Sequence, residues 1–70
     1  MELTKSFIVD TLQQLSINQK AIFKNKEGKA KVFFLKNNHY FITFDGHEIE
    51  TITDISAVVE TVLALLKMEE

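Results

Sequence analysis

Cysteine, proline and arginine are absent from this 70-residue sequence, and glycine occurs only twice. The lack of cysteine excludes disulfides and thiolate-bound metals, and two histidines alone cannot complete a typical structural zinc site. Domains of this size usually need such a staple, a dense core or self-association to remain folded. Because hydrophobic residues make up 46% of the chain, a dense core or self-association is what remains. We expect a single domain over residues 1–70 that needs no cofactor.

Long hydrophobic runs and targeting segments are missing as well. The longest apolar stretch, near residues 62–66, is far too short to cross a bilayer. The first residues lack the charged and apolar regions of a signal peptide. These features predict a cytoplasmic protein that does not enter a membrane. All eight basic residues are lysine, and the abundance of Lys, Asn and Ile is typical of an AT-rich genome, which favours a bacterial or phage origin.

Two segments have the apolar periodicity of amphipathic helices. The first is expected from about residue 4 to residue 15, with Thr4 as its N-cap and Asn18 as a left-handed terminator beyond it. The second is expected after Thr53-Asp54, a good N-cap pair, and runs to about Lys67. Its apolar stripe is so broad that we expect burial on more than one side.

Between the helices, apolar and β-branched residues predict four strands, at residues 21–23, 32–35, 40–44 and 47–52. Turn residues separate them, at Glu27-Gly28, Asn37-Asn38 and Asp45-Gly46. No proline interrupts any element. The predicted fold class is α+β, a four-stranded antiparallel β-meander flanked by N- and C-terminal α-helices.

Turn lengths determine which side chains share a face of the sheet. Two-residue loops pair Leu35 with Tyr40, Phe33 with Ile42, Phe34 with Phe41, Phe44 with His47, Thr43 with Glu48, Ile42 with Ile49 and Phe41 with Glu50. One face then carries Ile22, Phe33, Leu35, Tyr40, Ile42, Phe44 and Ile49. The other face carries Ala21, Phe23, Val32, Phe34 and Phe41.

Both faces are therefore apolar, and two arrangements of the helices follow. One helix can cover each face, which gives a three-layer monomer. Alternatively both helices cover the first face, and the second is left for a partner. We favour the second arrangement, with a protein interface formed by Phe23, Val32, Phe34 and Phe41.

Residues suited to catalysis are scarce. His39 and His47 each lie beside a turn, and the segment Asp45-Gly46-His47-Glu48 is better explained as a hairpin with polar flanks. Gly-rich phosphate loops, nucleophile elbows and the HExxH zinc motif are absent. The sequence predicts that the protein is not an enzyme, and a catalytic site built from the two histidines across subunits is the weakest hypothesis.

Charge is segregated along the chain despite a net charge of only −2. Residues 20–36 contain six lysines and one acid, whereas residues 45–70 contain seven acids and one lysine. Such a chain can steer a charged partner or pair with itself head to tail. The basic hairpin could also contact phosphates through Lys24, Lys26, Lys29 and Lys31, with Phe23, Phe34 and Phe41 as stacking faces. The missing arginine and the acidic overall charge argue against this alternative.

The leading functional hypothesis is a small non-enzymatic protein-interaction module of regulatory, adaptor or inhibitor type. We expect it to bind a protein partner and to form a homodimer through an apolar sheet face or the C-terminal helix. A nucleic-acid-binding module that uses the lysine hairpin is the alternative.

Overall fold

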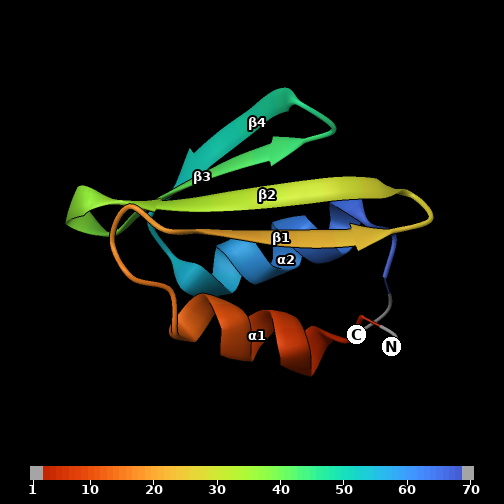
Figure 1. Ribbon diagram of the computed structural model, residues 1–70, viewed down its shortest axis with the longest axis horizontal. Helices are drawn as coiled ribbons and strands as arrows, with labels where there is room; N and C mark the ends of the chain where they lie inside the picture. The colour runs from red at the N-terminus through yellow and green to blue at the C-terminus, as the bar shows by residue number, and fades with distance from the viewer. Residues whose placement is uncertain (1–2, 69–70) are drawn as a thin grey trace.

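The computed structural model describes residues 3–68 as two helices and one four-stranded sheet (Figure 1). In chain order the elements are α1 (Lys5–Gln13), β1 (Lys20–Asn25), β2 (Gly28–Leu35), β3 (His39–Phe44), β4 (His47–Ile52) and α2 (Ile55–Leu65). All neighbouring strands are antiparallel, and their order in the sheet is β1-β2-β3-β4. The predicted α+β meander is confirmed.

Side-chain caps start both helices where the sequence predicts. The Thr4 hydroxyl accepts a hydrogen bond from the Phe7 backbone N–H at 3.1 Å, and the Asp54 carboxylate accepts one from the Ser56 N–H at 3.2 Å. Each cap satisfies an N–H that has no partner within its helix. Asn18 takes the predicted left-handed conformation, with φ at +68°. Both helices end about two residues earlier than expected, at Gln13 and Leu65.

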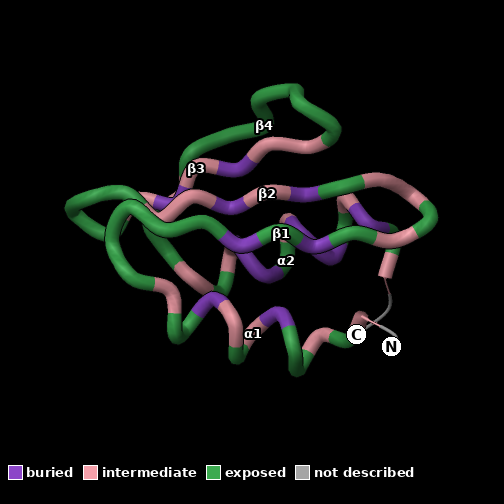
Figure 2. Tube along the Cα trace, viewed as in Figure 1, coloured by how far each residue is buried: buried purple, intermediate pink, exposed green. Residues whose placement is uncertain are grey.

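Both helices lie on the same side of the sheet, so the protein has two layers (Figure 1). α1 contacts β1, α2 contacts β3 and β4, and the two helices contact each other. Alternate positions of the first three strands are buried beneath the helices, while β4 is exposed along nearly its whole length (Figure 2). The core contains Ile8, Leu12, Ala21, Phe23, Ala30, Val32, Tyr40, Ile42, Val58, Val59, Val62, Leu63 and Leu66. The opposite face of the sheet is left open by both helices.

The predicted register between the second and third strands is wrong by one residue. A three-residue 3₁₀ turn, Lys36–Asn38, joins β2 to β3 in place of the expected two-residue loop. Asn37 and Asn38 both have left-handed φ, at +62° and +59°. The extra residue places Phe34 opposite Tyr40, where Phe41 was expected. Because side chains alternate along a strand, this slip exchanges the two faces of β1 and β2 relative to β3.

The predicted pairing between β3 and β4 is correct next to the turn and wrong beyond a β-bulge in β4. Phe44 pairs with His47 and Thr43 with Glu48, as expected, but Ile42 then pairs with Glu50, and Ile49 is left without a partner. The extra residue turns Ile52, which pairs with Tyr40, onto the helix side, where it packs against the core. A bulge also increases the local twist of an edge strand and disturbs its hydrogen-bonding edge.

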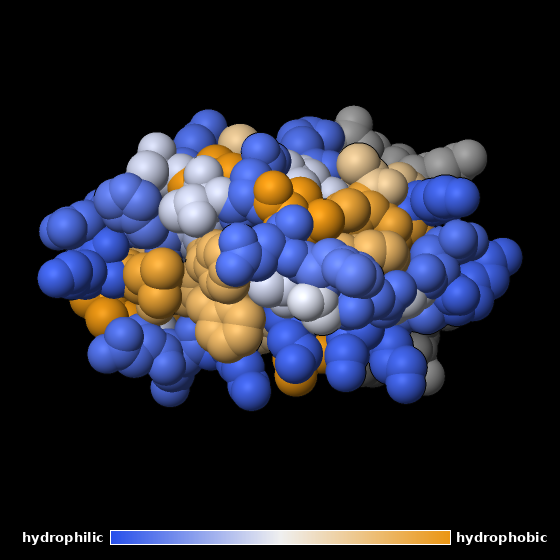
Figure 3. Space-filling model, turned by 90° about the horizontal axis from the view of Figure 1, so that it is seen from above, coloured by the Kyte–Doolittle hydropathy of each residue, from blue (hydrophilic) through white to orange (hydrophobic). Residues whose placement is uncertain are grey.

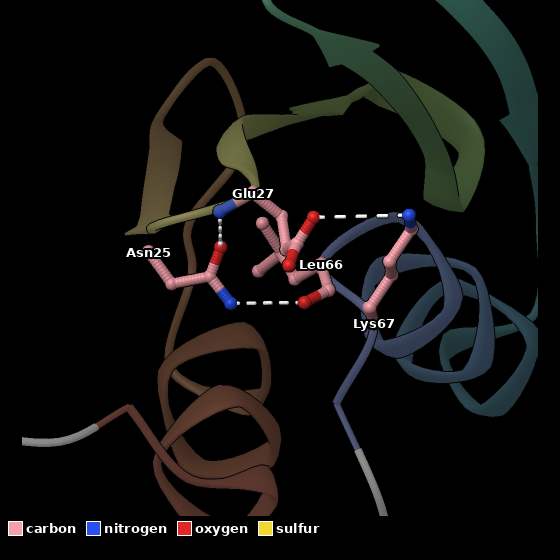
Figure 4. Close-up of polar contacts among 4 residues, drawn as sticks. All are labelled: Asn25, Glu27, Leu66 and Lys67. Carbon is pink, nitrogen blue, oxygen red and sulfur yellow. Dashed lines mark hydrogen bonds and ion pairs between the residues drawn. The ribbon is translucent and has the colours of Figure 1, made fainter.

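The first hairpin is fastened to the end of α2 by Asn25 (Figure 4). The Asn25 Nδ2 donates to the Leu66 carbonyl at 2.9 Å, and its Oδ1 accepts from the Glu27 N–H at 2.8 Å. The Glu27 carboxylate lies 3.8 Å from the Lys67 ammonium group across the same junction. One side chain thus satisfies a helix-end carbonyl and a turn N–H together.

Candidate functional site

The two helices leave one whole face of the sheet uncovered (Figure 1). Cross-strand pairing arranges its side chains in rows that run across all four strands. One row reads Ile22, Lys31, Thr43 and Glu48 from β1 to β4. The next row reads Lys20, Phe33, Phe41 and Thr51. We call this surface the open face, and it also includes Lys24, Lys29, Leu35 and His39.

An aromatic pair occupies the middle of the open face. Phe33 on β2 and Phe41 on β3 are direct cross-strand partners, with ring centroids 6.0 Å apart and planes inclined by 38°. Both rings are half-buried. The Lys20 ammonium lies 6.0 Å from the centroid of the Phe33 ring, which indicates a cation–π contact at the rim of the pair.

Two aliphatic side chains extend the apolar surface beyond the rings. Ile22 is 48% exposed and Leu35 is 39% exposed. Leu35 also lines a shallow hollow of about 490 Å³ at the end of the sheet, together with Ile17, His39 and Thr51. Figure 3, which shows the molecule from the side away from α1, has apolar patches through the middle and hydrophilic groups around them. An apolar centre with a polar rim is the usual anatomy of a protein interface.

Charge divides the open face into two halves. The β1–β2 half carries Lys20, Lys24, Lys29 and Lys31, and among the described residues it carries no acid. The β3–β4 half carries Glu48, and Asp45 lies in the turn at its end. Glu50 faces the helix side at the β4 edge, where its Oε1 accepts a hydrogen bond from the Thr61 hydroxyl at 3.3 Å. The face is thus basic on one side and neutral to acidic on the other.

The structure separates the four residues expected to form an interface. Phe23 and Val32 are fully buried beneath the helices, at 1% and 0% exposure. Phe34 is half-buried on the same side, where its ring stacks on Tyr40 with centroids 4.7 Å apart. Only Phe41 lies on the open face. The register slip explains the difference, because it moves the aromatic side chains of β2 to the opposite face from the one predicted.

Three of the four lysines in the proposed nucleic-acid contact set do lie together. Lys24 and Lys29 are directly opposite each other across the first hairpin, and Lys31 is on the same face. Lys26 lies in the turn between β1 and β2. The same surface also carries Lys20, Ile22, Phe33 and Leu35. From the sequence, the last three were expected on the face that the helices cover, and Lys20 was assigned to no site.

The two histidines are placed at opposite ends of β3. His39 begins that strand, and its Nδ1 lies 3.2 Å from the Lys36 carbonyl oxygen. His47 begins β4, opposite Phe44 at the other end of β3, and is exposed. Within one chain they are therefore too far apart to share a substrate atom. Over residues 3–68, no three histidine, aspartate or glutamate side chains are grouped closely enough to hold a metal ion.

In the part of the chain that the structure describes, neither helix has the length and apolarity needed to span a membrane. Two of the acids counted in the C-terminal half, Glu69 and Glu70, lie outside the described residues. Comparisons of the chain with family models, with curated proteins and with solved structures found no match.

Proposed function

We propose that the protein is a small non-enzymatic interaction module whose binding surface is the open face of the sheet. The observation that carries this proposal is that both helices cover one face, while the other exposes an aromatic pair and aliphatic side chains. Large apolar side chains that are left uncovered on one face of a small domain are typical of a protein-binding site. A regulatory, adaptor or inhibitor role fits a module that acts by covering a partner.

The apolar centre can supply the binding energy, and the lysines can supply orientation. Burying about 200 Å² of apolar surface contributes roughly 5 kcal/mol before the entropy of association is subtracted. Rim charges add less to affinity, but they raise the rate of encounter and exclude partners of the wrong sign. Phe33 and Phe41 should therefore determine affinity, while Lys24, Lys29 and Lys31 should determine salt dependence.

The test compares the wild-type chain with the double variant Phe33→Thr/Phe41→Thr, both immobilised and exposed to lysate of the source cells and to the free chain itself. Phe7→Ala is the matched control, since Phe7 is 43% exposed but lies on α1. We expect a bound protein that the double variant loses and the control retains. If wild type and double variant capture the same proteins to the same extent, the open face is not the binding surface.

Binding of a single-stranded nucleic acid is a second candidate, because the lysines and the aromatic pair share one face. Aromatic rings on the middle strands of a sheet can stack bases, and neighbouring lysines can neutralise phosphates. Two features make this candidate weaker. Lys20 lies against the Phe33 ring, and the most exposed apolar side chains on the face are aliphatic, Ile22 and Leu35.

This second candidate predicts steep salt dependence. Fluorescence anisotropy with a labelled single-stranded oligonucleotide should show binding at low salt that falls as salt rises. The change Lys31→Gln should weaken this binding, whereas Lys67→Gln, near the end of α2 on the other side of the sheet, should not. Equal effects of the two changes, or none after Lys24, Lys26, Lys29 and Lys31 are all neutralised, would remove the candidate.

A further inference from the structure

We infer that the partner on the open face is a second copy of this chain, related to the first by a two-fold axis that runs parallel to the strands between β2 and β3. This inference rests on the proposed function, because it names the occupant of the same surface. It is drawn from the order of side chains across the sheet and from the division of charge between the two halves of the face.

Rotation about this axis reverses the order of the side chains in each row. The reversed row of the partner then lies over the same row of the first copy. The row Lys20, Phe33, Phe41, Thr51 then faces its own reverse, so that Phe33 lies over the partner's Phe41 and Phe41 over the partner's Phe33. Four aromatic rings meet at the centre, with the exposed Ile22 and Leu35 around them. Sheets that pack face to face with aligned strands, about 30° apart, bury their facing side chains in this way.

The same axis brings unlike halves of the face together. In the row Ile22, Lys31, Thr43, Glu48, the reversed copy places the partner's Thr43 over Lys31 and the partner's Glu48 over Ile22. Lys31 and the partner's Glu48 are then one strand spacing apart, about 5 Å sideways, which a lysine side chain can span. The basic β1–β2 half covers the neutral to acidic β3–β4 half in both directions, as a self-complementary two-fold interface requires.

A perpendicular in-plane axis would oppose this pairing, because it would place lysines of the β1–β2 half over lysines of the same half. The charge pattern therefore selects one orientation of the dimer among those that an apolar face alone would permit. Like charges placed opposite each other in an interface are a common means of excluding wrong arrangements.

The area of the open face determines how tightly we expect the two copies to bind. Four strands about 5 Å apart and five to six residues long present roughly 400 Å² on each copy, or about 800 Å² in total. This area is below the roughly 1,200–2,000 Å² of stable specific interfaces and in the range of weak, transient ones, so we expect a dimer with a dissociation constant in the high micromolar range. Such a dimer forms in concentrated solution and dissociates on dilution.

Sedimentation equilibrium of the full chain from about 10 μM to about 1 mM spans this range of affinity. The average mass should rise with concentration from the 8.1 kDa of one chain towards twice that value. Phe33→Thr/Phe41→Thr should raise the dissociation constant at least about tenfold, because it removes the centre of the interface. Phe7→Ala should leave the constant unchanged.

Charge reversal tests the orientation and does not depend on the aromatic variant remaining folded. Lys31→Glu and Glu48→Lys should each weaken self-association about fivefold or more, because each places like charges in contact twice. An equimolar mixture of the two variants should recover association, since the two kinds of chain then pair with opposite charges. Asp10→Lys makes the same charge change as Glu48→Lys on the exposed side of α1 and should have no such effect.

Several results would overturn the inference. These are a monomer throughout the concentration range, a dimer that neither Phe33 nor Phe41 affects, and a mixture of the charge variants that associates no better than each variant alone. A monomer that captures a different protein, or an oligonucleotide, through Phe33 and Phe41 would also overturn the dimer. In that case the open face would remain a binding surface, so failure of this inference and failure of the proposed function are distinguishable.

Discussion

Both faces of the sheet carry large apolar side chains, but the surroundings of these side chains are very different. On the covered face, Phe23, Val32 and Ile42 are at most 1% exposed, beneath two helices that approach from one side. On the open face, Phe33 contacts Phe41 and Lys20, and residues 3–68 form no second layer above the two rings. The same residue types therefore form the core on one face and remain partly exposed to solvent on the other.

Replacement of a phenylalanine by alanine should give the largest difference in unfolding free energy between the two faces. Phe23→Ala should destabilise the domain by about 3–5 kcal/mol, because it leaves a cavity between β1 and α1. The matched change on the open face, Phe41→Ala, should cost about 1 kcal/mol, since its ring is already partly hydrated. Chemical denaturation followed by circular dichroism measures both, at concentrations low enough that self-association does not contribute. Equal losses would mean that the two faces are not as different as the structure indicates.

The covered face also depends on the junction that holds the first hairpin to the end of α2. Asn25→Ala should destabilise the fold by about 1–3 kcal/mol, because it leaves the Leu66 carbonyl and the Glu27 N–H without their partners. Lys67→Gln is the control at the same junction. It removes only an ion pair whose lysine is exposed to solvent, and it should change the unfolding free energy by less than about 0.5 kcal/mol. A large effect of the control would mean that the ion pair, and not Asn25, holds the hairpin to the end of α2.

The smallest effect is expected on the rim of the open face. Ile22→Thr keeps a β-branched side chain in the strand and removes an exposed methyl-rich surface, so the stability of the monomer should change by less than about 0.5 kcal/mol. Its effect should appear instead in the dissociation constant measured by sedimentation. A loss of stability without any change in association would place Ile22 in the core.

Elements and caps could be predicted from the sequence because their signals are local. Thr4 and Asp54 are good N-caps, and Asp45-Gly46 forms the predicted two-residue turn, with positive φ at both positions. The first two pairs beyond that turn were also predicted correctly, Phe44 with His47 and Thr43 with Glu48. Each of these features depends on a few neighbouring residues.

The faces could not be predicted in the same way, because one residue in a turn decides them. Asn37-Asn38 allows a two-residue turn, but the chain also uses Lys36, and nothing in the apolar pattern distinguishes the two cases when both faces are apolar. The bulge at Ile49 is a second non-local choice, which exchanges Ile49 for Ile52 at the core.

The lysines contained a usable signal for the first two strands. Lys20 and Lys24 alternate in phase with Ile22, and Lys29 and Lys31 alternate in phase with Phe33. Placing Ile22 and Phe33 in the core would therefore also have directed four lysines towards it, which is unfavourable for unpaired charges. Charged residues define the exposed face of these strands better than the large apolar residues do.

The assignment of the two faces can be tested most directly with single thiols, because the chain has no cysteine of its own. Val32→Cys and Ile22→Cys place one thiol on each face of adjacent strands, at positions 0% and 48% exposed. The rate of reaction with a thiol-specific reagent, measured in dilute native solution and in denaturant, reports the access of solvent to each position. This assignment of the faces predicts that the thiol at position 22 reacts within about tenfold of its rate in the unfolded chain, and that the thiol at position 32 is slowed at least about a hundredfold. Equal protection at both positions, or greater protection at position 22, would contradict it.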